Sequence, residues 1–221
     1  STLFPYTTLF RSPAGFLEER RKAVSHILVK NPEDYKGNWN SLFEDERDLI
    51  LEIGCGKGKF IVETALANPD KGYIAVEVQP SALVLAAEKA IKAEADNIFF
   101  VPVRIDSLES MFEEGELSGI YLNFSDPWPK AKHEKRRLTS GSYLESYSKV
   151  LRKGGFLEFK TDNSDLFDFS LEEISHTDFR IEVQSRDLHG SLLAEANIVT
   201  EYEDKFIRKG FRINYLKAVL K

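Results

Sequence analysis

The chain has 221 residues, 42% of them hydrophobic and 30% charged, which predicts one soluble globular domain with a full core. No apolar run approaches the roughly 20 residues that a membrane span needs, and the single cysteine, Cys55, excludes an internal disulfide and a cysteine zinc cluster. The formal net charge of -6 argues against a surface that is basic all over but leaves room for a local basic patch.

The first twelve residues stand apart from the rest of the chain. TLFPYTTLFRS, residues 2–12, resembles the translation of a common sequencing-adapter oligonucleotide, and the only methionine is Met111. We therefore expect residues 1–12 to be a sequencing-adapter or cloning artefact without ordered structure. The alternative is a genuine arm rich in aromatic residues. Residues 13–221 are expected to form a single domain with a short helical extension at its N-terminal end.

The following residues predict an alternation of helices and strands. An amphipathic helix is expected over residues 16–30, and a further helical turn over residues 38–43 carries Trp39. Apolar runs then predict strands, and the stretches between them predict helices. The expected strands are 48–53, 72–78, 97–103, 119–124 and 156–161, and the expected helices are 59–68, 80–95, 108–112 and 143–155.

This alternation predicts an α/β fold with a doubly wound, mostly parallel sheet that is covered on both faces. Two further strands are expected over residues 179–185 and 211–220, with no helix between them long enough for a crossover. They therefore predict an antiparallel pair at one edge of a seven-stranded sheet, with the C-terminal strand as an antiparallel edge strand.

A glycine-rich loop follows the first strand. LEIGCGKG places Gly54, Gly56 and Gly58 directly after a strand and before a helix, where backbone N–H groups and the helix dipole favour close approach of a ligand. Glu77 ends the second strand, where a carboxylate can accept both hydroxyls of a ribose. The order strand, glycines, helix, strand, acid predicts an adenosine-type cofactor rather than a purely structural turn.

Glu52 indicates which cofactor this is. It stands just before the glycines, where a carboxylate opposes the pyrophosphate of a dinucleotide but suits an amino-acid ammonium and a sulfonium cation. The glycines also lack the GxGxxG spacing of dinucleotide sites. Both features favour S-adenosylmethionine over NAD, and the competing structural interpretation of Glu52 is a partner for a helix dipole.

Several segments carry a family resemblance. LEIGCGKG, AVEV, LNFSDPWPKAKHEKRRLT, FKTDN and TEYEDKF occur in an order and spacing that resemble the bacterial tRNA (guanine-N7)-methyltransferases from about residue 36 to the C-terminus. The segment DPWPKAKHEKRR is highly specific to that family. The resemblance implies a Rossmann-like class I methyltransferase fold and methyl transfer from S-adenosylmethionine to N7 of a variable-loop guanine, position 46, in tRNA. It also implies a cytoplasmic enzyme, monomer or homodimer, without metal or membrane.

The resemblance also assigns roles to individual residues. Asp126 is implied to be catalytic. Contacts with S-adenosylmethionine are implied for Glu52, Gly54, Gly56, Gly58, Glu77, Arg104 and Asp126. Substrate contacts are implied for Lys130, Asp162, Thr200, Glu201, Tyr202 and Glu203, and RNA contacts for Lys132, His133, Lys135, Arg136 and Arg137. Arg104 departs from the family, because many relatives carry an acid or amide there that reaches the adenine. Either Asp106 compensates in a turn or backbone groups read the adenine.

The chemistry of guanine N7 explains which residues are needed. N7 is a lone-pair acceptor with no proton to remove, so the reaction needs positioning and electrostatic stabilisation rather than a general base. A carboxylate that accepts the guanine N1–H and amino N–H would orient the base. Asp126 and Asp162 both follow predicted strands and are both candidates, although Asp162 could instead cap the next helix.

The remaining motifs have competing structural interpretations. The basic run 130–137 could be a solvated loop, but its position behind a strand-end aspartate favours contact with tRNA phosphates. Thr200 and Glu203 have the spacing of a capping box, and His133 could stack on a base or remain exposed.

Two alternative functions compete with the first. NFSDPWP is close to the Asn/Asp-Pro-Pro-aromatic signature of enzymes that methylate exocyclic amino groups. The second alternative is a non-catalytic RNA-binding module with an unused cofactor loop. The presence of Glu52, Glu77 and Asp126 argues against it. A hydride-transfer enzyme is disfavoured by the glycine spacing.

Overall fold

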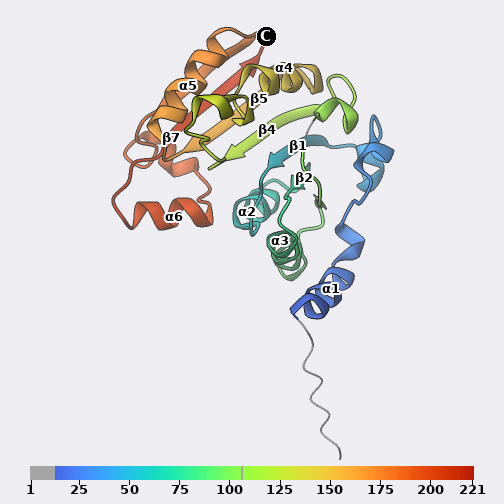
Figure 1. Ribbon diagram of the computed structural model, residues 1–221. Helices are drawn as coiled ribbons and strands as arrows, with labels where there is room; N and C mark the ends of the chain where they lie inside the picture. Colours follow the sequence, from blue (N-terminus) through green and yellow to red (C-terminus); the bar gives the residue numbers. More distant parts are fainter. Residues whose placement is uncertain (1–12, 106) are drawn as a thin grey trace, which may run out of the picture.

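The computed structural model describes residues 13–105 and 107–221, and in this part of the chain seven strands form one sheet in the order β3-β2-β1-β4-β5-β7-β6 (Figure 1). The expected artefact at residues 1–12 and Asp106 lie outside the described residues. The strands are β1 (Asp48–Ile53), β2 (Lys71–Val76), β3 (Ile98–Val101), β4 (Leu117–Asn123), β5 (Leu151–Thr161), β6 (Phe179–Ser185) and β7 (Asn214–Leu220). The α-helices are α1 (Pro13–Ala23), α2 (Lys59–Ala67), α3 (Pro80–Lys92), α4 (Gly141–Val150), α5 (Ser164–Ser175) and α6 (Glu201–Ile207).

The predicted α/β architecture is confirmed, including the parallel arrangement of β1 to β5. β7 runs antiparallel to both β5 and β6, so the antiparallel pair lies at one edge of the sheet as expected. The structure refines this prediction, because the C-terminal strand β7 is inserted between β5 and β6 and the outermost strand is β6.

The helix expected over residues 80–95 ends at Lys92, and the one expected over 108–112 is a 3₁₀ turn, Leu108–Ser110. Two other predicted helix boundaries are wrong by more. The helix expected over residues 143–155 ends at Val150, and its last five residues begin β5, where Leu151 pairs with Leu117 of β4. The helix expected over residues 16–30 ends at Ala23, and Leu28 bridges to Phe100 of β3. In both segments tertiary pairing with the sheet overrides local helical preference.

Two hydrophobic cores lie on opposite faces of the sheet. Side chains of β1 point alternately into the two cores. Leu49, Leu51 and Ile53 pack in the core that includes α4 and α5, whereas Ile50 packs in the core that includes α2 and α3. Trp39 is fully buried in the first core, and its indole N–H donates to the carbonyl of Met111 at 2.8 Å. The described residues hold no helix long and apolar enough to cross a membrane.

The position of the site follows from the strand order, because the sheet is extended from β1 to one side by β2 and β3 and to the other side by β4 and β5. β1 lies between β2, which follows it in the chain, and β4, which comes later after β3. Such a switch point leaves a crevice at the carboxyl ends of the strands, where ligands bind in open α/β sheets. The arrowheads of β1 and β4 in Figure 1 point toward the side of the molecule on which α6 lies.

Candidate active site

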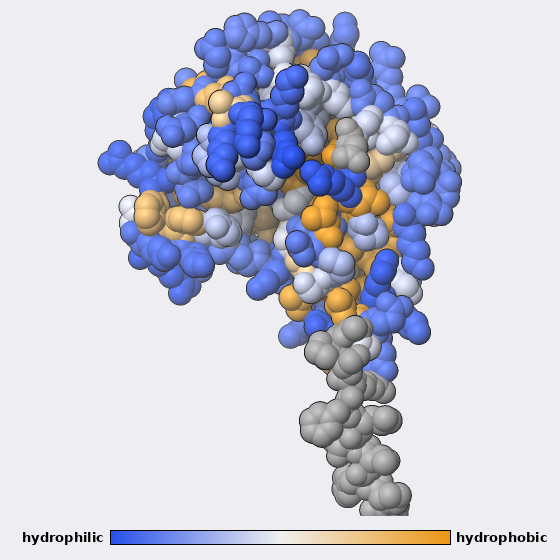
Figure 2. Space-filling view, in the orientation of Figure 1, coloured by the Kyte–Doolittle hydropathy of each residue, from blue (hydrophilic) through white to orange (hydrophobic). Residues whose placement is uncertain are grey.

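A cleft of about 670 Å³ opens at this switch point. Its lining combines apolar residues from the strand ends, such as Ile53, Val76 and Val103, with polar groups from the loops that follow them. Figure 2 shows apolar residues gathered near the middle of this face, bordered by polar ones. The predicted site residues in the lining are Gly54, Glu77, Arg104, Asp126, Lys135 and Arg136.

The glycine loop is shaped for close approach of a ligand. Gly54, Gly56 and Gly58 have φ angles of 82°, 56° and 80°, in the left-handed region that favours glycine. A Cβ at Gly58 would lie 2.6 Å from the Cβ of Ala86 on α3, so this glycine allows the loop to pack against the helix. Open space lies instead beside Gly54 and Gly56, where a bound molecule would contact backbone.

Glu77 is held in position before any ligand arrives. Its carboxylate accepts hydrogen bonds from the backbone N–H of Gly56 and of Gln79, both at 2.9 Å. The acid therefore connects the glycine loop to the start of α3 and presents its half-buried carboxylate at the cleft. This is the place from which the sequence analysis expected it to contact a ribose.

Glu52 is a buried acid with one unused oxygen. It lies at the end of β1, and its Oε1 accepts from Nδ2 of Asn123 at 2.8 Å, while Oε2 has no hydrogen-bond partner. Burial is the main reason why the pKa of Glu52 rises to about 7, and the hydrogen bond from Asn123 and the charge of Lys160 oppose this rise. A buried orphan carboxylate oxygen beside a glycine loop suits a cationic group such as an ammonium.

Asp126 stands in a strained loop. Phe124 and Trp128, on either side of it, have φ angles of 53° and 43°, which side-chain-bearing residues rarely adopt. Backbone strain of this kind is maintained only where the surroundings impose it. The Phe124 N–H donates to the carbonyl of Lys160 at 2.9 Å, which fixes the start of the loop. Asp126 itself is exposed at the mouth of the cleft.

The basic run is divided between two tasks. The Arg137 guanidinium donates to the carbonyls of Pro127 and Trp128 at 3.0 and 3.2 Å and lies over the ring of Phe169, so it fastens the strained loop from within. Arg136 lies over the ring of Trp128, with its guanidinium carbon 4.9 Å from the ring centre.

Of the other members of the run, Lys132, His133 and Lys135 lie on a 3₁₀ helix, Ala131–Arg136, and Lys130 is its N-cap. The side chains of Lys130, Lys132 and Lys135 are exposed. His133 is half-buried and meets Trp128 edge to face, with the ring centres 5.7 Å apart. In this structure His133 therefore has a ring partner within the protein.

Asp162 follows β5 and is half-buried. The cap of α5 is not Asp162 but its neighbour Asn163, whose Oδ1 accepts from the N–H of Leu166 at 2.8 Å. The competing structural interpretation of Asp162 as a helix cap is therefore wrong. Its carboxylate stays a candidate for reading the substrate.

The segment 200–203 is confirmed as a capping box. Thr200 Oγ1 accepts from the N–H of Glu203 at 2.9 Å, and Glu203 Oε2 accepts from the N–H of Thr200 at 3.2 Å. Glu203 is fully buried and also pairs with Lys160, whose Nζ lies 3.2 Å from its Oε2. Burial lowers the pKa of Lys160, and the charge of Glu203 opposes this effect. Thr200 and Glu203 therefore have structural roles whatever else they contact.

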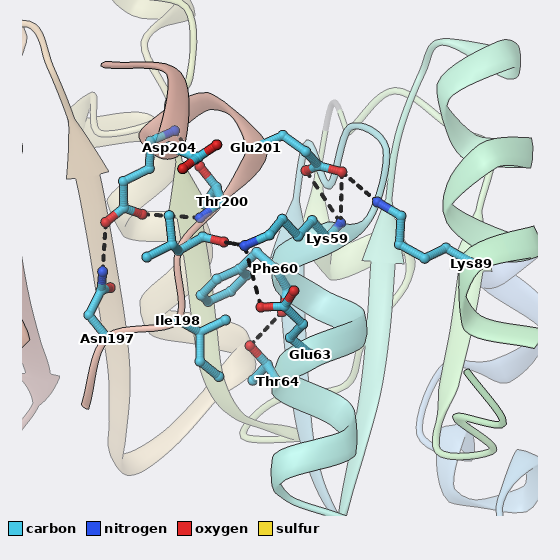
Figure 3. A network of polar contacts seen from close by, with 12 residues as sticks. Lys59, Phe60, Glu63, Thr64, Lys89, Asn197, Ile198, Thr200, Glu201 and Asp204 are labelled. Carbon is cyan, nitrogen blue, oxygen red and sulfur yellow. Dashed lines mark hydrogen bonds and ion pairs between the residues drawn. The ribbon is translucent and has the colours of Figure 1, made fainter. Parts of the chain in front are cut away.

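The other two residues of this segment face outward. Glu201 accepts from the backbone N–H of Lys59 at 3.2 Å and pairs with Nζ of Lys89 at 2.5 Å, so it ties α6 to α2 and α3 (Figure 3). Tyr202 is 54% exposed, and its ring centre lies 5.6 Å from that of Phe124 in the strained loop. Tyr202 thus places this segment beside Phe124, which lines the cleft.

Asn123 and Lys160 are functional candidates that the sequence analysis missed. Asn123 ends β4, which neighbours β1, and Lys160 is the next-to-last residue of β5, one strand further along the sheet; by register both lie on the same face as Glu52. The order of strands cannot be deduced from the order of segments along the chain, so nothing in the sequence pairs Asn123 with Glu52. The one signal that was available is an amide at a strand end, as the first residue of NFSD.

The donor set suits an organic cation better than a metal ion. The described residues contain no cluster of three or more His, Cys, Asp or Glu side chains that could hold a metal. The orphan oxygen of Glu52, the open backbone at Gly54 and Gly56, and the fixed carboxylate of Glu77 fit the ammonium, the amino-acid backbone and the ribose of S-adenosylmethionine respectively.

Comparisons with known proteins agree with this geometry. Residues 46–216 match the family model described as "Putative methyltransferase". The chain is 48% identical over 196 residues to a tRNA (guanine-N(7)-)-methyltransferase of Geobacillus sp. strain WCH70, covering 89% of each protein. It is 47% identical over 184 residues to the enzyme of that name from Bacillus subtilis strain 168, covering 83% of this chain and 86% of that protein.

Solved structures support the fold alone, because sequence identity to them is low. The 16S rRNA methyltransferase KamB aligns with a TM-score of 0.61 and 12% identity, covering 84% of this chain and 93% of that one. A SAM-dependent O-methyltransferase from Thermotoga maritima aligns with a TM-score of 0.53 and 14% identity, covering 100% of this chain and 67% of that one. The expected class I methyltransferase fold is thereby confirmed.

Proposed function

The chain belongs to the tRNA (guanine-N(7)-)-methyltransferase family, and on this premise we propose that it transfers a methyl group from S-adenosylmethionine to N7 of a variable-loop guanine, position 46, in tRNA. The observation that carries this proposal is the orphan oxygen of buried Glu52, which lies near the end of β1 just before the glycine loop, while Asp126 follows the neighbouring strand β4. Because the proposed substrate is tRNA, we place the activity in the cytoplasm, in a monomer or a homodimer.

S-adenosylmethionine supplies the methyl group, carried on its sulfonium centre. In this proposal Glu52 pairs with the ammonium of the methionine part, and Glu77 accepts from the ribose hydroxyls. Gly54 and Gly56 let backbone approach the cofactor, and the apolar strand ends Val76 and Val103 pack against the adenine. Arg104 lines the same part of the cleft, and whether it or Asp106 contacts the adenine is decided by mutating each in turn.

The protein then needs to hold guanine with N7 toward the methyl group. Asp126 and Asp162 follow β4 and β5, which are neighbours in the sheet, so both carboxylates lie at the edge where the base would enter. A carboxylate there accepts the N1–H and amino N–H of guanine and stabilises the positive charge that the base gains. Lys130 and the exposed cations behind it would pair with tRNA phosphates.

Nucleoside analysis tests the proposal. Purified protein is incubated with unmodified tRNA and methyl-labelled S-adenosylmethionine, and the digested tRNA is separated by chromatography. The expected product is 7-methylguanosine, and it should disappear when the variable-loop guanine is replaced by adenine. Label in an exocyclic methylamino group would instead support the exocyclic alternative. RNA binding without affinity for S-adenosylmethionine in calorimetry would support the binding module.

A further inference from the structure

The last turn of α6 and the residues that follow it have an unusual composition for an acidic protein. Residues 205–212, KFIRKGFR, contain four cations and no acid, whereas the whole chain has a net charge of -6. The side chains of Lys205, Arg208, Lys209 and Arg212 are all exposed. Neither the glycine loop nor the basic run 130–137 accounts for this second concentration of positive charge.

Aromatic rings connect this segment to the active site. Tyr202 contacts Phe124 in the strained loop, Phe206 lies 5.0 Å from Tyr202 between ring centres, and Phe211 lies 5.4 Å from Phe206. Tyr202 and Phe211 are 54% and 55% exposed. Figure 2 shows apolar residues at the surface on the side where Figure 1 draws α6. Exposed rings interleaved with cations are typical of surfaces that bind nucleic acid.

The segment is held firmly where it leaves the site. At its start, Glu203 is buried against Lys160, and Glu201 is tied to Lys59 and Lys89 (Figure 3). At its end, Ile213 is fully buried and β7 begins at Asn214. The cations between these anchors therefore project from a fixed base rather than from a loose tail.

Simpler explanations cover only part of the observations. Cations in the last turn of a helix are favoured by its dipole, which accounts for Lys205 and Arg208. The dipole does not account for Arg212, which lies beyond the helix, or for the exposed ring of Phe211. Arg208 and Arg212 pair with Asp204 and Asp187 at 2.9 and 3.5 Å, but both pairs are exposed and can exchange for phosphates at little cost.

We infer that Tyr202, Lys205, Arg208, Lys209, Phe211 and Arg212, here called the α6 surface, form a second RNA-binding surface in addition to residues 130–137. The inference rests on the proposed function and adds a partner contact to it. The cations pair with phosphates of the tRNA backbone, and Phe211 offers a stacking face to an unpaired base. RNA is the partner of matching chemistry, because the four exposed cations attract phosphates and would repel the same surface on a second copy of this chain.

The test combines a charge variant with a matched control. Lys205→Ala/Lys209→Ala removes two exposed cations from the α6 surface, and Lys153→Ala/Lys221→Ala removes two exposed cations from the far end of the β5–β7 pair, at the start of β5 and just after β7. We expect the first variant to bind tRNA about tenfold more weakly, with a salt slope lower by about 2, and the control to match the wild type. Affinity for S-adenosylmethionine and the melting temperature should stay unchanged in both. A tRNA affinity within twofold of the wild type in the first variant would overturn the inference.

A ring variant tests the stacking part. Phe211→Ser should weaken tRNA binding about tenfold, and Phe211→Trp should restore it, because stacking contributes about 1–3 kcal/mol per base. If Phe211→Ser disperses a wild-type dimer in light scattering while tRNA affinity stays constant, the surface serves self-association and the inference fails. Failure of the proposed function is a separate outcome, because in that case the wild-type protein would form no 7-methylguanosine in tRNA.

Discussion

Asp126 and Glu52 show how two carboxylates at neighbouring strand ends acquire different properties. Asp126 is exposed in a strained loop, whereas Glu52 is buried with one oxygen unpaired. In the proposed function the first meets the incoming base, and the second pairs with the ammonium of the cofactor. Removing either carboxylate should therefore produce a different defect.

Replacing Asp126 by alanine should abolish methyl transfer without unfolding the protein. An exposed side chain contributes little to stability, whereas loss of an oriented carboxylate in the transition state costs about 100-fold or more in kcat. Single-turnover transfer to tRNA and thermal melting measure the two effects. Calorimetry with S-adenosylmethionine then shows whether Asp126 also contacts the cofactor, and the Asp162→Ala variant is the comparison. Near wild-type transfer by Asp126→Ala would remove it from the site.

Replacing Glu52 by glutamine should stabilise the cofactor-free protein at high pH while weakening cofactor binding. The pKa of Glu52 rises from 4.5 to about 7 on folding, so the folded state binds more protons than the unfolded state between these values. Stability therefore falls as pH rises from 4.5 through about 7, and the variant lacks this loss, on the order of 1–3 kcal/mol. Denaturant unfolding at about pH 5 and about pH 8 measures the difference.

The same proton governs cofactor affinity. Ionised Glu52 is the form that pairs with an ammonium, so wild-type affinity for S-adenosylmethionine should fall about tenfold per pH unit below about pH 7. Glu52→Gln should show weak binding at every pH. A wild-type affinity that does not change between about pH 6 and about pH 8 would contradict this role.

At the scale of elements, the site depends on two segments that side-chain contacts fix in place: the loop after β4 and the start of α6. Arg137 fastens the loop after β4, and the buried pair of Lys160 and Glu203 fastens the start of α6 to β5. The first contact uses a half-buried guanidinium and the second a buried ion pair, so removing either charged group breaks several contacts at once.

Arg137 and its neighbour Arg136 should give distinct phenotypes. Arg137→Gln loses the hydrogen bonds to Pro127 and Trp128, so the strained loop relaxes and kcat falls while tRNA affinity changes little. Arg136→Gln should weaken tRNA binding and lower its salt slope by about 1. Steady-state kinetics at several salt concentrations separate the two. Identical salt slopes in both variants would contradict the division of tasks.

Glu203→Ala should destabilise the protein on the order of 3 kcal/mol, because it leaves Lys160 buried without its partner and removes the capping box. Glu201→Ala, which breaks the exposed pair with Lys89, should cost less than about 1 kcal/mol. Urea unfolding of the two variants side by side measures this. Equal costs would mean that the buried pair does not anchor α6.

At the scale of the whole molecule, this acidic protein concentrates exposed cations in residues 130–137 and 205–212. Its net charge of -6 opposes binding to nucleic acid at a distance, so affinity must come from the local cations at the mouth of the site. Such affinity falls steeply with salt.

Replacing Lys132, Lys135 and Arg136 together by alanine should lower the salt slope of tRNA binding by about 3 and weaken binding at every salt concentration. Filter binding of tRNA between about 50 and about 200 mM salt measures the slope. Cofactor affinity is the control and should stay constant. An unchanged slope would mean that this run is a solvated loop, as the competing interpretation held.

The sequence by itself determined the class of fold and the chemistry of the cofactor loop. Strand periodicity, three glycines and the acids Glu52 and Glu77 are local signals, and each keeps its meaning wherever the neighbouring strands lie. The capping box at Thr200 and Glu203 was predictable for the same reason, since it spans only four residues.

Only the tertiary structure decided which distant groups meet. The order of strands brings Asn123 to Glu52, folding buries Lys160 against Glu203, and the turn after Arg136 directs Arg137 back into the loop that carries Asp126. The boundary between α4 and β5 was likewise settled by pairing with β4. Contacts between residues far apart in the chain depend on strand order and burial, and neither can be predicted from the local pattern of residues.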